Sequence, residues 1–195
     1  HNQDWTSTDL EALSPSAQPI TQYKPAGDRT TYDSLYTHWD NSSARDHYRI
    51  AWRAMAANTG ERTFIPSIIP PGSTHVHGVS STGSNDLTLS SLPAILGVSS
   101  SLLADFSVRS SPKSTIQMST INRLPRLNEN DSLTLRIVAR VLRLNCLTDA
   151  YADLWTECWD ESFVADTPIL ERHDERPIGP ESVSYTHLRA HETRH

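Results

Sequence analysis

The fold is decided by the stretch Arg62-Thr63-Phe64-Ile65-Pro66-Ser67-Ile68-Ile69-Pro70-Pro71-Gly72. Its phenylalanine and three isoleucines are strong strand formers, and the closing Pro-Pro-Gly enforces a turn. The pattern therefore predicts a buried strand that ends in a tight turn at Gly72.

The segment before this strand has the spacing of an amphipathic helix. Its apolar side chains recur at i, i+3, i+4 and i+7, namely Tyr48, Ala51, Trp52 and Met55. This predicts a helix from Asp46 to Ala57 that ends at Thr59-Gly60. Arg45, Arg49 and Arg53 would then form a basic stripe on that helix. Such a stripe is either a solvated face whose arginine stems cover apolar surface, or a face that contacts phosphates.

The segment after Gly72 alternates over Thr74–Val79 and predicts a second strand with His75 and His77 on one face. A His-x-His pair can bind zinc, but two ligands do not make a site. Cys146 and Cys158 are too far apart in the sequence to form a Cys-x-x-Cys pair. We therefore predict no metal site.

Two long helices are predicted in the second half of the chain. The first starts at Ser90-Ser91 and ends near Arg109. Its apolar residues fill about half of a helical wheel: Leu92, Ile95, Leu96, Val98, Leu102, Leu103 and Phe106. The second helix starts at Ser132, and its apolar face shifts near residues 145–148, which indicates a break or two helices. Between them, residues 116–121 form either a short strand or a helical turn.

This order of elements is that of an α+β fold. Residues 1–45 read as irregular and as part of a domain that continues upstream, and residues 46–131 as the core domain. Residues 132–165 read as a helical segment and residues 166–195 as a disordered tail. The first residue is His1, so we expect a fragment of a longer protein.

The end of the tail resembles the in-frame translation of a sequencing adapter, over Val183-Ser184-Tyr185-Thr186-His187-Leu188-Arg189-Ala190-His191-Glu192-Thr193. His187 and His191 stand at i and i+4 and imitate a metal-binding pair. We leave residues 183–195 out of the fold and the function.

Charge is unevenly distributed in this chain of net charge -6. Residues 99–145 carry 7 Lys and Arg against 3 Asp and Glu, whereas residues 146–182 carry 2 against 10. The overall acidity excludes a wholly basic nucleic-acid module, but the basic middle permits local phosphate contact. Two cysteines give no disulfide framework and fit a reducing compartment. No apolar run reaches membrane length, so we expect a cytoplasmic protein without a membrane partner.

Four segments carry a resemblance to a known family. They are YRIAWRAMAANTGERTFIPSIIPPG (48–72), LPAILGVSSSLLADFSVRSS (92–111), STINRLPRL (119–127) and LRLNCLTDAYADLW (142–155). In this order they resemble the C-terminal target-recognition region of large adenine-specific DNA methyltransferases, found in type IIG-like restriction-modification and related phage-defence systems. The second segment lacks the asparagine usual in that family, and Leu124-Pro125-Arg126 lacks its second proline.

The resemblance implies a parent enzyme that transfers a methyl group from S-adenosylmethionine to an adenine in DNA. That chemistry needs a glycine-rich cofactor loop and an Asn/Asp-Pro-Pro-aromatic motif for the extruded base. Pro70-Pro71 is not this motif, because Ile69 precedes it and Gly72 follows it. We therefore expect no cofactor and no catalytic residue in this chain, and a methyltransferase domain upstream. The expected partners are double-stranded DNA and that domain.

Six basic residues are predicted to include phosphate contacts: Arg49, Arg53, Arg62, Lys113, Arg123 and Arg126. Base-reading groups would come from the loops 74–85 and 110–116. The alternative is a non-catalytic protein-interaction or scaffold fragment whose arginines form ordinary solvated faces. A hydrolase using His38 with Asp40, or His75, has no supporting nucleophile motif.

Overall fold

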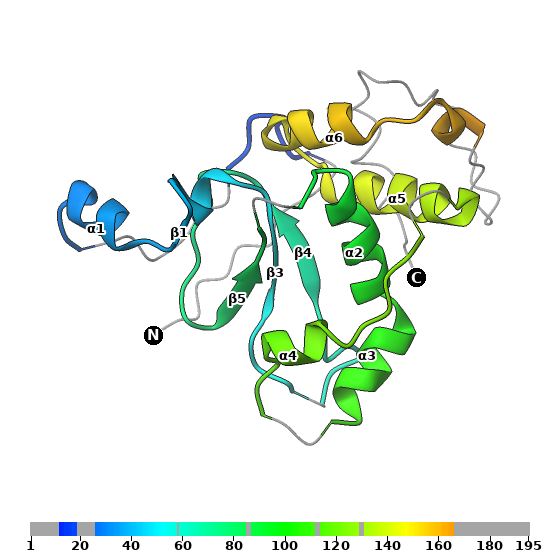
Figure 1. Cartoon of the computed structure of the whole chain (residues 1–195), viewed down its shortest axis with the longest axis horizontal. Coiled ribbons are helices and arrows are strands. Elements are labelled where there is room, and N and C mark those ends of the chain that lie inside the picture. Colours follow the sequence, from blue (N-terminus) through cyan, green and yellow to red (C-terminus); the bar gives the residue numbers. More distant parts are fainter. Residues whose placement is uncertain are drawn as a thin grey trace.

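The computed structural model describes residues 12–18, 26–57, 59–84, 87–111, 114–128 and 131–165. Lys113, the tail 166–195 and the adapter-like residues within it lie outside these ranges. A three-stranded antiparallel sheet in the order β4-β3-β5 forms the centre (Figure 1). Its strands are β3 (Arg49–Arg53), β4 (Pro66–Ile69) and β5 (Val79–Thr82). With the helices around it, this is the α+β fold that the sequence predicts.

A strand within Arg62–Gly72 is confirmed as β4, but β4 lies at the edge of the sheet and Ile68 is its only buried residue. Ile68 is fully buried and stands opposite Ile50 of β3. The turn after β4 is also as predicted: Gly72 has φ +80, a conformation that side-chain-bearing residues rarely adopt. Its N–H donates to the carbonyl oxygen of Arg45 at 2.7 Å, which ties the turn to the chain before β3.

The helix predicted from Asp46 to Ala57 is wrong, because this segment contains the central strand β3. Tyr48, Ile50 and Trp52 are spaced by two and all belong to the buried core. Neighbouring strands pair with β3 on both sides and satisfy its backbone, so tertiary pairing overrides the helical spacing. The basic stripe of Arg45, Arg49 and Arg53 therefore does not exist as one helix face.

The second strand lies later than predicted. It is β5 (Val79–Thr82), whereas His75 and His77 lie in the loop that precedes it. His75 is held there by its ring, whose Nε2 is 2.8 Å from Oγ of Ser81.

The helix predicted from residue 91 to residue 109 is two helices, α2 (Ser91–Ser99) and α3 (Leu102–Arg109), with a bend of 58° between them. Ser101 causes the break, because its Oγ accepts the N–H of Ala104 and starts a new helix. The bend turns three predicted core residues outward. Leu102, Leu103 and Phe106 are 75%, 81% and 70% exposed.

The remaining helices follow the prediction more closely. Residues 116–121 include the helical turn α4 (Met118–Ile121), and α5 (Ser132–Asn145) begins at the capping residue Asp131. The break predicted near residue 147 separates α5 from the 3-10 turn Asp149–Tyr151 and α6 (Ala152–Cys158). A further 3-10 turn, Glu161–Ala165, follows.

The core lies between the sheet, α2, α5 and α6 (Figure 1). Gly97 of α2 allows this packing, because a Cβ there would overlap Cγ2 of Ile137 on α5. Two tyrosine hydroxyls tie the α6 region to the sheet region. Tyr48 donates to the carbonyl oxygen of Ala150 at 2.8 Å, and Tyr151 donates to that of Ile68 at 2.9 Å.

The described part of residues 1–45 is more regular than predicted. It contains α1 (Arg29–Leu35), capped by Asp28, and the strand pair β1 (His38–Trp39) and β2 (Ser42–Ser43). A 3-10 turn, Ala44–Asp46, leads from this hairpin toward β3.

Within the described residues, no single helix is long and apolar enough to cross a membrane. The bent pair α2 and α3 meets the length and composition required only when the two helices are taken together.

Candidate nucleic-acid interface

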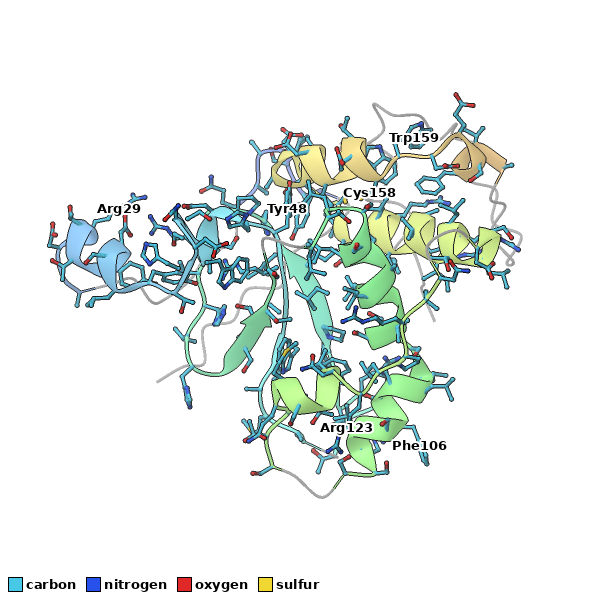
Figure 2. All side chains as sticks on the ribbon, viewed as in Figure 1. Arg29, Tyr48, Phe106, Arg123, Cys158 and Trp159 are labelled. Carbon is cyan, nitrogen blue, oxygen red and sulfur yellow. The ribbon has the colours of Figure 1, made fainter. Side chains whose placement is uncertain are left out.

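Arg123 and Arg126 lie on the surface segment that joins α4 to α5 and are exposed. This segment is held by its apolar residues, because Ile121 is buried and Leu124 is half-buried against the core. The backbone N–H of Arg123 donates to the carbonyl oxygen of Thr120 at 3.3 Å, but within the described part of the chain neither guanidinium group forms an ion pair or a hydrogen bond. Both guanidinium groups are therefore available to an anionic partner. Figure 2 shows Arg123 near α4, at the end of the molecule remote from α1.

Arg49 is buried, with 1% of its surface exposed, and its contacts are internal. Nη1 donates to the hydroxyl of Tyr36 at 3.0 Å, and Nη2 donates to the carbonyl oxygen of Ser73. The guanidinium also lies over the Tyr36 ring, 5.9 Å from its centroid. Arg49 thus joins the chain before β1 to the loop after β4. A buried arginine with these partners does not reach a phosphate, so we remove it from the proposed contacts.

Arg53 and Arg62 are half-buried and have partners of their own. Nη2 of Arg53 lies 3.4 Å from the carbonyl oxygen of Thr63. Nη2 of Arg62 donates to the carbonyl oxygen of Ser100 at 2.6 Å, at the break between α2 and α3. These arginines have structural contacts, and only part of each side chain faces solvent. The sixth predicted residue, Lys113, lies outside the described residues.

The buried carboxylate of Asp105 is contacted by two backbone N–H groups and by two arginines. One oxygen accepts the N–H of Thr63 at 2.8 Å and that of Phe64 at 2.7 Å. Arg62 and Arg109 each approach the carboxylate to 3.7 Å. Burial by itself would raise the pKa of Asp105. The N–H groups of Phe64 and Thr63, followed by the two arginines, outweigh it and hold this pKa below its ordinary value of 3.8.

Arg109 completes this arrangement from the last turn of α3. Its Nη2 donates to the carbonyl oxygens of Gly60 and Glu61, each at 2.9 Å, and its Nε donates to Oγ1 of Thr63 at 3.2 Å. We call Asp105 and Arg109 the α3 clamp. The α3 clamp binds the backbone that enters the Arg62–Gly72 stretch. The sequence reasoning missed it, although two opposite charges at i and i+4 on a helix whose other residues are apolar or serine were a usable signal.

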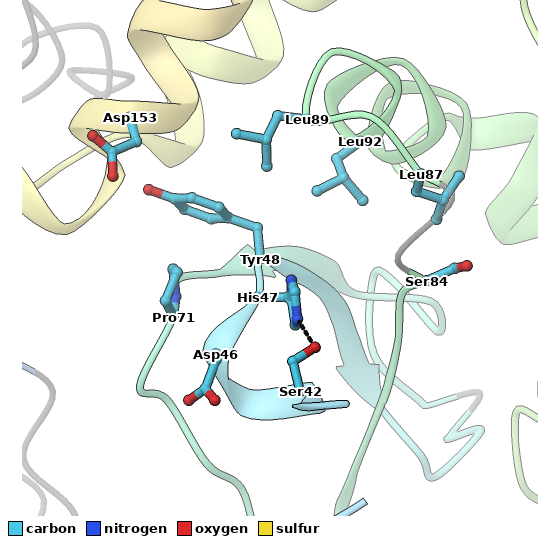
Figure 3. A pocket seen from close by; sticks show the side chains of 10 residues that line it. All are labelled: Ser42, Asp46, His47, Tyr48, Pro71, Ser84, Leu87, Leu89, Leu92 and Asp153. Carbon is cyan, nitrogen blue, oxygen red and sulfur yellow. Dashed lines mark hydrogen bonds between the residues drawn. The ribbon is translucent and has the colours of Figure 1, made fainter. Parts of the chain in front are cut away.

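A second polar site, not predicted from the sequence, lies in a cavity of about 510 Å³ beside the β1–β2 hairpin (Figure 3). Oγ of Ser42 is 2.7 Å from Nε2 of His47. No carboxylate of the described residues hydrogen-bonds the other ring nitrogen of His47. A serine nucleophile needs its histidine oriented by such a third group. The pair therefore does not form a hydrolytic triad. Tyr48 also lines this cavity, and burial raises the pKa of its hydroxyl to about 12, so this hydroxyl stays protonated at neutral pH.

No group of three or more potential metal ligands occurs among the residues that the structure describes. Cys146 and Cys158 are free and buried. Burial raises the pKa of both thiols, that of Cys158 to about 12, so they remain protonated at neutral pH and are poor nucleophiles.

Comparison with known proteins finds no matching family model, no matching curated protein and no matching solved structure.

Proposed function

We propose that this chain binds double-stranded DNA as the target-recognition part of a cytoplasmic, S-adenosylmethionine-dependent adenine DNA methyltransferase. One observation carries the proposal. The α3 clamp, from the resembling segment 92–111, binds residues 60–64 of the resembling segment 48–72. Two of the segments that resemble the family are thus in direct contact and belong to one structural unit. This supports a common architecture over four accidental matches.

The DNA contact that we propose is centred on Arg123 and Arg126. Both lie in the third resembling segment, 119–127, and both are exposed on a segment anchored by apolar residues. Exposed arginines on an anchored loop suit phosphate binding, which positions a protein on the duplex without reading its sequence. Arg53 and Arg62 contribute at most through their exposed parts. Because the whole chain carries a net charge of -6, the attraction for DNA is local.

Methyl transfer would belong to a domain upstream of residue 1 in the parent protein, which would also bind S-adenosylmethionine. The test is to extend the reading frame upstream in the source DNA, express the longer protein and supply it with radiolabelled S-adenosylmethionine and duplex DNA. We expect a glycine-rich loop, an Asn/Asp-Pro-Pro-aromatic motif and label on adenine. An upstream frame of domain length that lacks both motifs would contradict the proposal.

A second candidate function is a protein-interaction fragment, and the exposed face of α3 favours it. Leu102, Leu103 and Phe106 form an uncharged apolar surface on this helix, and Phe106 points outward in Figure 2. Exposed apolar surface of this kind is a feature of protein contacts. Binding to duplex DNA at low salt distinguishes the two candidates. DNA binding is strongest at low salt, so the assay is run at roughly 50 mM salt. A folded chain that does not bind DNA under this condition would favour the protein-interaction function.

A further inference from the structure

A mainly apolar cavity of about 330 Å³ lies between α2, α4 and the chain segment 124–127. Its apolar wall includes Leu92, Ile95, Val98, Met118, Ile121 and Leu124. The volume falls within the range of roughly 300–1,000 Å³ typical of small-molecule sites. It is too small for a helix or strand of a protein partner, so a small molecule is the occupant to consider.

One hydroxyl in this wall has no partner. Ser99, at the end of α2, is 1% exposed, and its Oγ is buried without a hydrogen bond in the described structure. A buried polar group left unpaired costs roughly 1–3 kcal/mol. Such groups are uncommon in native proteins, and each one calls for an explanation. Because this Oγ is itself buried, a polar atom of a bound molecule would pair with it after the Ser99 side chain rotates toward the cavity.

The described residues that line the cavity carry charge of one sign only. Arg126 is the only charged residue among those that line it in the described structure, and it is exposed. Asn122, also exposed, adds an amide at the same edge. Among the residues that the structure describes, no carboxylate lines the cavity, so a cationic molecule would find no ion partner among them. A carboxylate or phosphate head would find a guanidinium with which it can form charge-assisted hydrogen bonds.

We propose that this cavity binds a small amphipathic anion. The apolar body lies between α2 and α4, a hydrogen-bonding atom of the ligand pairs with Oγ of Ser99, and the acidic head pairs with Arg126. The inference does not depend on DNA binding, because it rests on the cavity, the unpaired hydroxyl and the sign of the charge. The occupant differs from S-adenosylmethionine, which carries a sulfonium cation.

Three related probes test the proposal by isothermal titration calorimetry: 3-(4-hydroxyphenyl)propionate, 3-phenylpropionate without the hydroxyl, and the cation tyramine. We expect the hydroxylated anion to bind and tyramine to bind at least about tenfold more weakly, a difference of about 1.4 kcal/mol. Amide resonances of Val98, Ser99 and Ile121 should shift on titration. Equal binding of the anion and tyramine would overturn the proposal, and so would binding by none of the probes up to about 10 mM.

Matched variants locate the contacts. Arg126→Gln should weaken the hydroxylated anion about tenfold, the loss expected when one charge-assisted contact is removed. Arg123→Gln also removes one positive charge, but Arg123 does not line the cavity. The affinity of this variant for the hydroxylated anion should therefore stay within about twofold of wild type. Ser99→Ala should abolish the preference for the hydroxylated probe over 3-phenylpropionate. Equal effects of Arg126→Gln and Arg123→Gln would show that the anion binds the surface and not the cavity.

Discussion

Asp105 is the residue on which the packing of α3 against the Arg62–Gly72 stretch depends. Asp105→Ala leaves two buried N–H groups, of Thr63 and Phe64, without an acceptor and removes the partner of two arginines. We expect a loss of about 3 kcal/mol in the free energy of unfolding, measured by urea titration. Glu157→Ala, at an exposed position of α6, is the control and should change this value by less than about 0.5 kcal/mol. Equal losses in both variants would contradict the clamp.

The pH dependence of the free energy of unfolding should include a contribution from the carboxylate of Asp105. Because its pKa is lower in the folded chain, Asp105 contributes stability that is fully present above its ordinary value of 3.8. That contribution disappears as the pH falls from there through the folded-state pKa. In Asp105→Asn, Oδ1 can still accept both N–H groups, but the titrating charge is gone. Urea titrations between about pH 6 and pH 2 should therefore show a shallower acid decline for this variant than for wild type. Parallel curves would show that other carboxyl groups cause the decline.

Whether a single charged side chain is buried was the feature that the sequence predicted least well. Nothing in the sequence around Arg49 distinguishes it from an exposed arginine. Its partners Tyr36, Ser73 and Ser81 are distant in the sequence and come close to it only in the folded chain. Arginines are rarely buried without such partners, and the partners come from three separate segments. The exposed positions of Arg123 and Arg126 are compatible with the prediction made from the sequence, while their contact with DNA stays a prediction.

Among the helices, strands and turns, the sequence predicted correctly those that depend on residues close to them in the chain. The Pro-Pro-Gly turn after β4 and the start of α5 at Ser132 were both predicted, and the residues that cause them lie within a few positions in the sequence. The central strand β3 was not predicted, because Tyr48–Arg53 fits both a helical and an alternating pattern. Its two neighbours decide between them, and they are provided by residues 66–69 and 79–82. The break at Ser99-Ser100-Ser101 had a signal, since serine is a preferred helix cap.

The contact between α2 and α5 depends on a glycine, which gives a prediction for this pair of helices. Gly97→Ala gains up to about 1 kcal/mol of helix propensity. The added Cβ would overlap Cγ2 of Ile137, however, and overpacking costs about 1–3 kcal/mol. We therefore expect a net loss of stability of about 1 kcal/mol in thermal or urea unfolding. In the control Gly78→Ala, no atom lies within 4 Å of the added Cβ, and stability should be unchanged or slightly higher. A stabilised Gly97→Ala would contradict the close packing.

At the scale of the whole molecule, the sequence predicted the α+β class, because class follows from the order of strands and helices. The placement of the candidate site depended on tertiary structure. Of the six basic residues predicted to contact DNA, the structure describes five: one is buried, two are half-buried and two are exposed together between α4 and α5. The α3 clamp joins positions about 40 residues apart, a pairing that a local pattern does not encode.

The salt dependence of DNA affinity tests the central claim most directly. Binding of a fluorescent duplex is measured by anisotropy over a range of salt concentrations, for wild type, Arg123→Ala/Arg126→Ala and the control Arg29→Ala. Arg29 is exposed on α1, at the far end of the molecule from Arg123 (Figure 2). Each lost phosphate contact lowers the slope of log Kobs against log salt by about 0.9, so we predict a slope smaller by about 2 in the double variant and unchanged in Arg29→Ala. Identical slopes for wild type and the double variant would contradict DNA binding through Arg123 and Arg126.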